Sequence, residues 1–347
     1  MLLAKRLLSW AGGVRTSIRK RRVAPLACLI AALALAGPGA LPSPAPAAAA
    51  RRGHAVPRPP AAATSYYMRT VNPHHLYRMG CRLGARVVHG SEPHDALVVL
   101  AFGSPRHRGL RFGTSLFGGR FASTSRIGTA GVRYARGFHH CTRKRPGATL
   151  RIALGTSNYG RFVGYHHGRA WAFMVNRANR RLEALGYSDR IDVTAADDIE
   201  PDWSGPRAAR AWVRGYDSAN QWPYYDFGGA AGCPPYGNCA GSWTLEDVWY
   251  VSWGAAPAIP LPEIYTKSGS SAKQWYRVSL YSAVRHGASM TIAGVVSQHR
   301  ACHQTPDPCR GMNNTSPRAW KQLSKYLNSD RRTAQHIRWA TDMSWAK

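Results

Sequence analysis

The acidic residues of this chain are concentrated in one short stretch. Of the 17 Asp and Glu in the sequence, six fall within fourteen consecutive positions: Asp189, Asp192, Asp197, Asp198, Glu200 and Asp202. If 190–200 form a strand, successive side chains alternate between its two faces. One face then carries Val193, Ala195 and Ile199, and the other carries Asp192, Thr194, Ala196, Asp198 and Glu200. Buried carboxylates without partners are unfavourable, so the second face needs a polar cavity, such as the inside mouth of a barrel.

Polar and aromatic residues also follow other strand-like runs. Those expected at or just after strand ends are Asn158, Asp226, Trp253, Glu263, Tyr265 and Gln298. In a parallel barrel the carboxyl ends of the strands meet at one face, where functional residues gather. Carboxylates, amides and aromatic rings together are typical of a glycan site. One acid with a raised pKa protonates the leaving oxygen, and a second carboxylate attacks the sugar or activates water.

The elements that must position these residues alternate along the chain. Apolar or alternating runs predict strands over 96–102, 149–155, 190–200, 224–227, 247–253, 262–265 and 288–297. Helical spacing predicts helices over 169–185, 206–218, 271–286, 317–327 and 331–339. This alternation favours an α/β fold, a (β/α)8-like (TIM) barrel that need not be regular. An open doubly wound sheet is the alternative, and the lack of a GxGxxG or P-loop motif excludes only its nucleotide-binding versions.

The Asp-x-Glu pattern of Asp198 and Glu200, at the end of an acid-rich strand, resembles that of several glycoside-hydrolase barrel families, including chitinase-like and lysozyme-like ones. With Trp253-Gly254 and the Pro-Glu-Ile-Tyr run at 262–265, the chain is similar to a secreted bacterial member of the glycoside-hydrolase-like TIM-barrel superfamily, of no assigned family, over roughly 95–298. The resemblance implies Glu200 as the proton donor, with Asp198 orienting it and raising its pKa by like charge. The chitinase-type pattern has a further Asp where this chain has Ala196.

The same resemblance implies roles for the other strand-end residues. Asp226 or Glu263 would supply the second carboxylate, and Asn158, Tyr265 and Gln298 would hydrogen-bond sugar hydroxyls. Candidates for stacking on sugar faces are Trp203, Trp222, Tyr224, Trp243 and Trp253. The alternative for the Asp-x-Glu pair is structural pairing with arginines, since ion-pair networks also gather carboxylates. A Trp, likewise, is usually a core or rim residue.

The N-terminal region is typical of an export signal followed by a linker. Residues 1–50 have a basic start, a short apolar run and a Pro/Ala-rich end, the layout of a secretory signal peptide. The apolar run is shorter than the ~20 residues that a membrane span requires. Residues 51–65 are rich in Pro, Ala and Arg and predict a disordered linker, which leaves 66–347 as a single barrel domain. We therefore expect a secreted or cell-surface protein with no transmembrane segment after signal cleavage, exported by the Sec or the twin-arginine route.

The cysteines beyond the signal are even in number, which favours disulfides in an exported chain. They are Cys81, Cys141, Cys233, Cys239, Cys302 and Cys309. Cys233 and Cys239 bracket a short loop, as do Cys302 and Cys309, so each of these pairs suits a local disulfide. Cys81 is then left to pair with Cys141, although six cysteines allow fifteen connectivities. A zinc site is the rival interpretation, but the chain has no CxxC pair.

The chain is strongly basic, with a formal net charge of +30, and 96–182 contain sixteen Lys or Arg and no acidic residue. Such a surface attracts polyanions, and for an exported protein we expect a polysaccharide or an anionic wall polymer as the partner, with no specific nucleic acid. No cofactor is expected. A metal is not expected either, because the three His pairs (74–75, 139–140 and 166–167) are adjacent residues that point apart. The oligomeric state is left open.

Two hypotheses of function result. The first is a secreted glycoside-hydrolase-like enzyme that acts on a cell-wall or extracellular polysaccharide by carboxylate general acid/base chemistry. The second is a non-catalytic surface protein that keeps the barrel and holds anionic wall polymers or glycans on its basic face. Ala196, where the chitinase-type pattern has Asp, favours the second.

Overall fold

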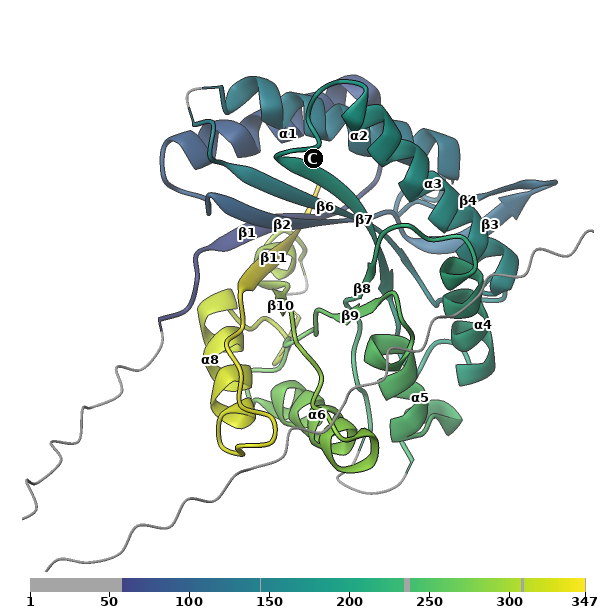
Figure 1. The fold of residues 1–347 in the computed structure, drawn as a ribbon, viewed down its shortest axis with the longest axis vertical. Coiled ribbons are helices and arrows are strands. Elements are labelled where there is room, and N and C mark those ends of the chain that lie inside the picture. The colour runs from purple at the N-terminus through teal and green to yellow at the C-terminus, as the bar shows by residue number, and fades with distance from the viewer. Residues whose placement is uncertain (1–57, 144, 234–237, 307–308, 347) are drawn as a thin grey trace, which may run out of the picture. The chain divides into compact units, whose positions relative to one another are not determined.

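Eight parallel strands form the central sheet of the computed structural model, which describes residues 58–346 apart from 144, 234–237 and 307–308. In chain order the strands are β1 (Ala62–Tyr67), β2 (Asp95–Ala101), β6 (Thr149–Ser157), β7 (Ile191–Asp198), β8 (Tyr224–Asp226), β9 (Ala258–Pro260), β10 (Gly294–Ser297) and β11 (Trp339–Trp345). Their order in the sheet is β10-β11-β1-β2-β6-β7-β8-β9 (Figure 1). Apart from β9 and β10, each strand of this sheet pairs with the one before it in the chain, and β11 returns to β1, which is the order of a (β/α)8-like barrel.

The barrel is completed between β9 and β10 without a regular ladder. The carbonyl of Pro262 accepts from the N–H of Val296, and the N–H of Ile264 donates to the carbonyl of Val296, both at 2.9 Å. An isolated parallel bridge joins Glu263 to Val296. This seam places Glu263 at the carboxyl end of the barrel, next to β10.

The two faces of β7 pack against different layers, as the alternation predicted. Val193 and Ala195 belong to the apolar layer between the barrel and its helices, whereas Ala196 packs inside the barrel. Other members of the inner layer are Leu97, Val99, Tyr225, Phe227, Leu261 and Met343. Asp198 and Glu200 continue the inward-facing row above this apolar plug.

Helices cover the outside of the barrel. They are α1 (Pro73–Val88), α2 (Thr124–Cys141), α3 (Tyr165–Glu183), α4 (Pro206–Asp217), α6 (Ser270–His286) and α8 (Ser316–Leu327), with the shorter α5 (Leu245–Trp249) and α7 (His299–Cys302). Their buried faces follow helical spacing: on α3 these include Trp171, Val175, Ala178 and Leu182. The helices predicted within 169–185, 206–218, 271–286 and 317–327 are therefore confirmed, within a few residues at each end.

A small antiparallel sheet is inserted between β2 and α2. It consists of β3 (Ser104–Arg108), β4 (Arg111–Ser115) and β5 (Phe121–Ser123). Neither this insertion nor α1 and α2 was predicted from the sequence. The loop between β4 and β5 brings Phe117 to the carboxyl end of the barrel.

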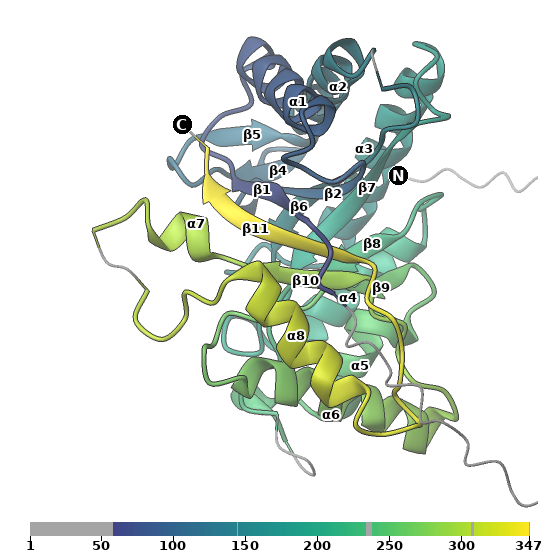
Figure 2. The ribbon, with the colours of Figure 1, turned by 90° about the vertical axis from the view of Figure 1, so that its left-hand side faces the viewer.

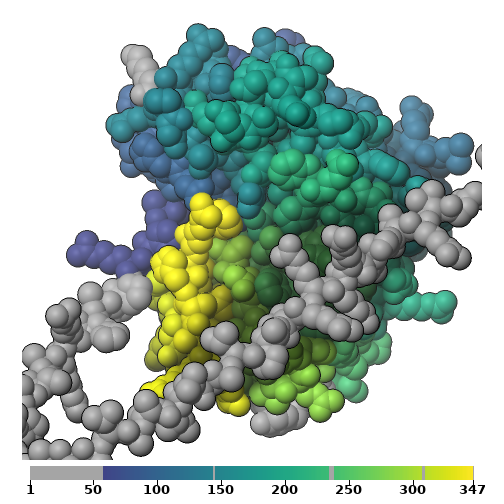
Figure 3. All heavy atoms as spheres, in the orientation of Figure 1, coloured from purple at the N-terminus to yellow at the C-terminus, as the bar shows by residue number. Residues whose placement is uncertain are grey.

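β1 and β11 lie at the two ends of the described chain and pair from Ala62–Ala340 to Tyr67–Trp345. Figure 2 shows β11 between β1 and β10, and Figure 3 shows the yellow C-terminal segment beside the purple start of the described chain. The predicted linker 51–65 therefore ends too late, because β1 begins at Ala62. The rest of the linker up to residue 57, and the predicted signal peptide, lie outside the described residues.

Three predicted elements are wrong. The strand predicted over 262–265 is reduced to the isolated bridge at Glu263, and β9 lies just before it. The segment 247–253, predicted as a strand, is helical: α5 is followed by the π-helix η2 (Tyr250–Gly254). Thr244 and Asp247 form a capping box, with a 2.7 Å side-chain hydrogen bond, and this start signal outweighs the β-favouring aromatic residues that follow. The helix predicted over 331–339 is absent, and the chain forms β11 from Trp339 onward.

Three disulfides join the favoured pairs. Cys81–Cys141 links α1 to α2, while Cys233–Cys239 and Cys302–Cys309 close local loops. The pairing favoured from spacing is thus confirmed. Among the described residues, no helix combines the length and the apolar character needed to cross a membrane.

Candidate active site

Three carboxyl groups meet at the carboxyl end of the barrel. Asp198 ends β7, Glu200 follows two residues later, and Glu263 lies at the seam between β9 and β10. One oxygen from each of the three lies within 4.8 Å of the others. None of the three belongs to an ion pair among the described residues, whereas Asp192, at the other end of β7, pairs with Arg151 at 2.8 Å. Pairing with arginines therefore does not account for this cluster.

Burial raises the pKa of all three carboxyl groups, and the charges of the other carboxylates add to this for Asp198 and Glu263. For Asp198 the causes are burial and then the charge of Glu200, and for Glu263 they are burial and then the charges of Asp198 and Glu200. Burial also raises the pKa of Glu200, but hydrogen bonds from Glu263 and from the backbone of Gly229 act in the opposite direction. The side-chain hydrogen bond between the two glutamates lowers the pKa of Glu200 and raises that of Glu263. The surroundings of the two glutamates therefore differ, and they favour the protonated form of Glu263 more than that of Glu200.

A cavity of about 610 Å³ opens above the carboxyl groups. Its walls come from the segments that follow the strands, and they include the aromatic side chains of Tyr67, Phe117, Tyr159, Trp203, Tyr265 and Trp345. Trp203 is 40% exposed and meets Tyr159, which is 59% exposed, edge to face at a centroid distance of 5.7 Å. Tyr67 packs against Trp345 with centroids 4.8 Å apart. The cavity thus combines acids at its floor with aromatic rings at its rim.

Tyr265 and Gln298, two of the predicted sugar-binding residues, line this cavity. The hydroxyls of Tyr265 and Tyr67 lie 3.2 Å apart, and the Tyr67 hydroxyl donates to Gln298 Oε1 at 3.4 Å. A further side-chain hydrogen bond joins Tyr265 to Glu263. These three side chains form a polar wall beside the carboxyl cluster.

Asn158, also predicted to bind sugar, lies beneath the cavity and is fully buried. Its Nδ2 donates to the carbonyl of Glu200 and its Oδ1 accepts from the N–H of Glu200, each at 2.9 Å. Both functional groups of the amide are therefore engaged, and Asn158 is a positioning residue for Glu200. Gly229 supports the same side chain, because a Cβ at this position would lie 2.7 Å from Glu200 Oε2.

Asp226, one of the two candidates for the second carboxylate, does not line the cavity. It faces the helix layer, accepts from Ser252 Oγ at 2.5 Å and from the N–H of Gly228 at 3.2 Å. Asp197 is its register partner on β7 and is equally buried. The strand alternation explains this placement. Odd-numbered positions of β7 point outward, and Asp226 lies beside one of them, Asp197, in the register of β7 and β8. Glu263 is thus the second carboxylate that the fold brings to Glu200.

Of the five aromatic residues proposed to stack on sugars, Trp203 lines the cavity and the other four do not. Trp253 lies on η2 and packs against the outer core, as does Trp222. Trp243 is buried and its Nε1 donates to the carbonyl of Ser204 at 2.8 Å, while the Tyr224 hydroxyl donates to the carbonyl of Val251. The error for Trp253 follows from the helical structure of 247–253.

Comparison with known proteins gives no family for this chain. No protein-family model matches it, and no curated protein does. The site is therefore interpreted from its own geometry.

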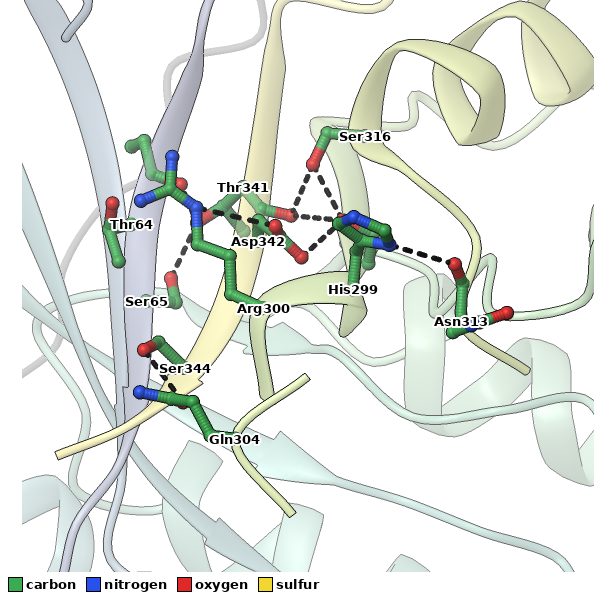
Figure 4. Close-up of polar contacts among 12 residues, drawn as sticks. Thr64, Ser65, His299, Arg300, Gln304, Asn313, Ser316, Thr341, Asp342 and Ser344 are labelled. Carbon is green, nitrogen blue, oxygen red and sulfur yellow. Dashed lines mark hydrogen bonds and ion pairs between the residues drawn. The ribbon is translucent and has the colours of Figure 1, made fainter. Parts of the chain in front are cut away.

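The loop after β10 is fixed by a second polar network (Figure 4). Asp342 on β11 accepts from Ser297 Oγ at 2.8 Å and lies 3.4 Å from Arg300 Nε on α7. The side chain of Gln304 accepts from the hydroxyl of Ser344 and from the N–H of Trp345. These contacts hold α7, and with it Gln298, against the end of β11.

Four aromatic residues of the cavity were not predicted as site residues from the sequence: Tyr67, Phe117, Tyr159 and Trp345. Tyr67 and Trp345 end strands that were not predicted, and Phe117 lies in the loop between β4 and β5 of the inserted sheet. A usable signal was present in 339–345, where Trp-Ala-Thr-Asp-Met-Ser-Trp has the alternation of a strand.

The carboxyl cluster is also of the ligand type that hard cations such as Ca²⁺ and Mg²⁺ prefer, so the three oxygens that approach within 4.8 Å could hold one.

Proposed function

We propose that this protein is a secreted glycoside hydrolase that cleaves a cell-wall or extracellular polysaccharide by carboxylate chemistry. The observation that carries the proposal is the meeting of Asp198, Glu200 and Glu263 at the floor of an aromatic-rimmed cavity. A pair of carboxyl groups with separated protonation states is the minimum that glycosidic hydrolysis requires. The volume of the cavity suits a segment of a glycan chain.

Glu263 is the proton donor in this proposal and Glu200 is the facing carboxylate. Burial and the charges of Asp198 and Glu200 raise the pKa of Glu263 well above its usual range, which favours the protonated form of this group. The Glu200 carboxylate is stabilised by the Gly229 amide and by Glu263. These roles are the reverse of those that the sequence resemblance implies for Glu200. The charge of Asp198, at the end of β7, adds to the rise in the pKa of Glu263.

The short separation favours a retaining mechanism. Retaining glycosidases have carboxyl groups about 5–5.5 Å apart, whereas inverting enzymes leave about 6.5–9.5 Å for a water molecule. Oxygens of Glu200 and Glu263 lie within 4.8 Å of each other. Glu200 would then attack the anomeric carbon while Glu263 protonates the departing oxygen, and water would later release the sugar with Glu263 as the base.

Export is part of the proposal. Three disulfides among the described residues favour an oxidising compartment, because cytosolic thiols are kept reduced. The signal-like layout of 1–50 points the same way. A polysaccharide outside the cell is the substrate that such a protein meets.

Reducing-end release tests the proposal. The purified protein, its Glu200→Gln and Glu263→Gln variants and a surface control, Glu183→Gln, are incubated with peptidoglycan, chitin and acidic glycans. We expect release by the unmodified protein and by the control, and a loss of at least about 100-fold in each site variant. Azide should restore turnover to Glu263→Gln on a substrate with a good leaving group. A duplicate series with EDTA separates carboxylate chemistry from a metal-dependent reaction.

Other outcomes favour the alternative function. If the unmodified protein releases no sugar from any of these glycans but keeps salt-sensitive binding, the non-catalytic surface protein is the better description. If release survives both site substitutions, the carboxyl cluster is not the catalytic site. Loss of activity in EDTA would replace the direct role of Glu200 with metal binding by the same carboxylates.

A further inference from the structure

A groove of about 380 Å³ runs between α2 and α3, on the flank of the barrel. These neighbouring helices lie over the β2–β6–β7 part of the barrel (Figure 1). Four arginines line the groove, Arg133 and Arg136 from α2 and Arg177 and Arg181 from α3, and all four are exposed. We call this feature the α2–α3 groove. Its lining is separate from that of the cavity above the carboxyl cluster.

The positive charge of the groove has no acidic counterpart. Among the described residues, the side chains of the four arginines take part in no ion pair, hydrogen bond or ring contact. The sequence from 96 to 182 contains no Asp or Glu. Glu183, at the end of α3, lines a different cavity on the other side of that helix, together with Asn176 and Asn179.

The spacing brings these like charges together rather than apart. Arg133 and Arg136 are three residues apart, and Arg177 and Arg181 are four apart, so each pair lies on one face of its helix. Like charges at these spacings destabilise a helix. An anion bound in the groove would lie between the cations of both helices, so attraction to the anion would offset the repulsion between the arginines.

The rest of the lining narrows the class of anion. The hydroxyl residues Ser125 and Thr129 lie along the α2 side of the groove, and its apolar contribution comes from aliphatic side chains and Met174. The lining has no aromatic ring, which is the element that stacks bases in sites for single-stranded nucleic acid. The two arginines of each pair are about 4.5–6 Å apart along the helix axis, a spacing that suits successive charges along an extended chain.

Phosphate fits this groove better than carboxylate. Guanidinium groups bind both in bidentate geometry. The two free oxygens of a phosphodiester are arranged tetrahedrally and can face opposite walls, whereas the two oxygens of a carboxylate lie in one plane and point the same way. Arginines stand on both walls here, one pair on α2 and one on α3.

We infer that the α2–α3 groove binds a linear polymer of polyol phosphates, through at least two successive phosphodiester groups. The inference does not depend on the activity of the carboxyl cluster. In a barrel the helices begin at the carboxyl ends of the strands. Ser125, at the start of α2, therefore marks the end of the groove nearer the cavity. A bound phosphate polymer holds the protein on its surface and leaves the acid-lined cavity open to a sugar chain.

The test compares two variants with equal loss of charge. The groove variant carries Arg133→Gln, Arg136→Gln, Arg177→Gln and Arg181→Gln. The control carries Arg207→Gln, Arg214→Gln, Lys321→Gln and Lys325→Gln, four exposed cations on α4 and α8. Binding of poly(glycerol phosphate) is measured by calorimetry at 50 and 200 mM salt. We expect the groove variant to bind at least about tenfold more weakly than the unmodified protein, with a reduced salt dependence, and the control to change less than about threefold.

Three comparison ligands complete the test: polygalacturonate, oligo(dT) and phosphatidylglycerol vesicles. The inference is supported if the unmodified protein binds poly(glycerol phosphate) more tightly than each of these three ligands and the groove variant loses that binding. Equal losses in the groove variant and the control would reduce it to attraction by net charge. Equal or tighter binding of any comparison ligand would overturn the assignment to a polyol phosphate. Circular dichroism and thermal unfolding verify that both variants fold, and unchanged release from a neutral glycan in the groove variant keeps this result separate from the proposed hydrolase activity.

Discussion

Asn158 and Glu200 are joined by two hydrogen bonds of 2.9 Å between the side-chain amide of Asn158 and the backbone of Glu200. Asn158 follows the end of β6 and Glu200 follows the end of β7, so the amide connects two neighbouring strand ends. The chain direction at Glu200 therefore depends on a residue that does not itself touch the cavity.

We expect Asn158→Ala to lower kcat by about 10- to 100-fold and to change KM much less, because a displaced carboxylate loses orientation without losing the sugar-binding walls. Stability should fall by about 1–3 kcal/mol, since two backbone groups lose their partner. Asn176→Ala is the matched control: Asn176 also bridges two backbone groups, those of Ala219 and Gln221, but outside the site. An equal fall in kcat in both variants would show that lost stability, not orientation, is the cause.

Gly229 gives a second prediction. A Cβ at this position would lie 2.7 Å from Glu200 Oε2, so Gly229→Ala should push the Glu200 carboxylate out of place and remove its contact with the backbone amide. Loss of that amide should raise the apparent pKa of the acidic limb in the pH–rate profile, because the Glu200 anion is then less stabilised. Gly147→Ala is the control, since no atom lies within 4 Å of its added Cβ. A pH profile identical to that of the unmodified protein would contradict this role.

The inward orientation of Asp198 and Glu200 was predictable because the two carboxylates are two residues apart, which is the side-chain period of a strand. Asp198 and Glu200 share a parity with Ala196, so one alternation placed both on the inner face and sent Asp197 outward. The same rule, applied to β8, places Asp226 outward with Tyr224, because Tyr225 packs inside the barrel. With only three residues, β8 shows too little alternation for the sequence alone to assign Asp226 to a face.

The rim of the cavity was less predictable because its residues lie on elements with weak local signals. β1 follows a Pro/Ala-rich segment that masks its start, and the inserted sheet has strands of only three to five residues. The 247–253 segment carries aromatic and β-branched residues but folds as a helix, since the Thr244–Asp247 capping box and packing against the barrel decide. Tertiary contacts, which a local pattern does not contain, fix these elements.

Trp203 gives a third prediction, about substrate length. It is 40% exposed at the rim and is braced edge to face by Tyr159. Trp203→Ala should raise KM for long glycans by about five- to thirtyfold, the equivalent of about 1–2 kcal/mol of lost ring contact, with a smaller change in kcat. Phe173→Ala, which removes an aromatic ring of similar exposure from α3, should leave KM unchanged. A kcat loss without a KM change would place Trp203 at the reacting bond instead of the rim.

Asp197 and Asp226 give a prediction on stability and pH. The two residues are register partners on β7 and β8 and are both buried against the helix layer. Burial raises the pKa of Asp226 to about 7, and burial with the charge of Asp226 raises the pKa of Asp197. Asp197 has no hydrogen-bond partner for either carboxyl oxygen among the described residues. Folding therefore favours the protonated form of this pair.

The sign of the effect follows from proton uptake. An unfolded Asp titrates near pH 4, so between about pH 4 and 7 the folded protein binds a proton that the unfolded chain has lost. The contribution of Asp226 to stability is thus fully present below about pH 4 and is lost as the pH rises to about 7, by up to about 4 kcal/mol. Asp226→Asn and Asp197→Asn remove this titration. Urea unfolding at pH 4.5, 6.0, 7.5 and 8.5 should show each variant gaining stability relative to the unmodified protein as the pH rises, whereas Asp217→Asn, on the surface, should keep a constant difference. A difference for Asp226→Asn that is constant across this range would show that the pair is ionised in the folded protein.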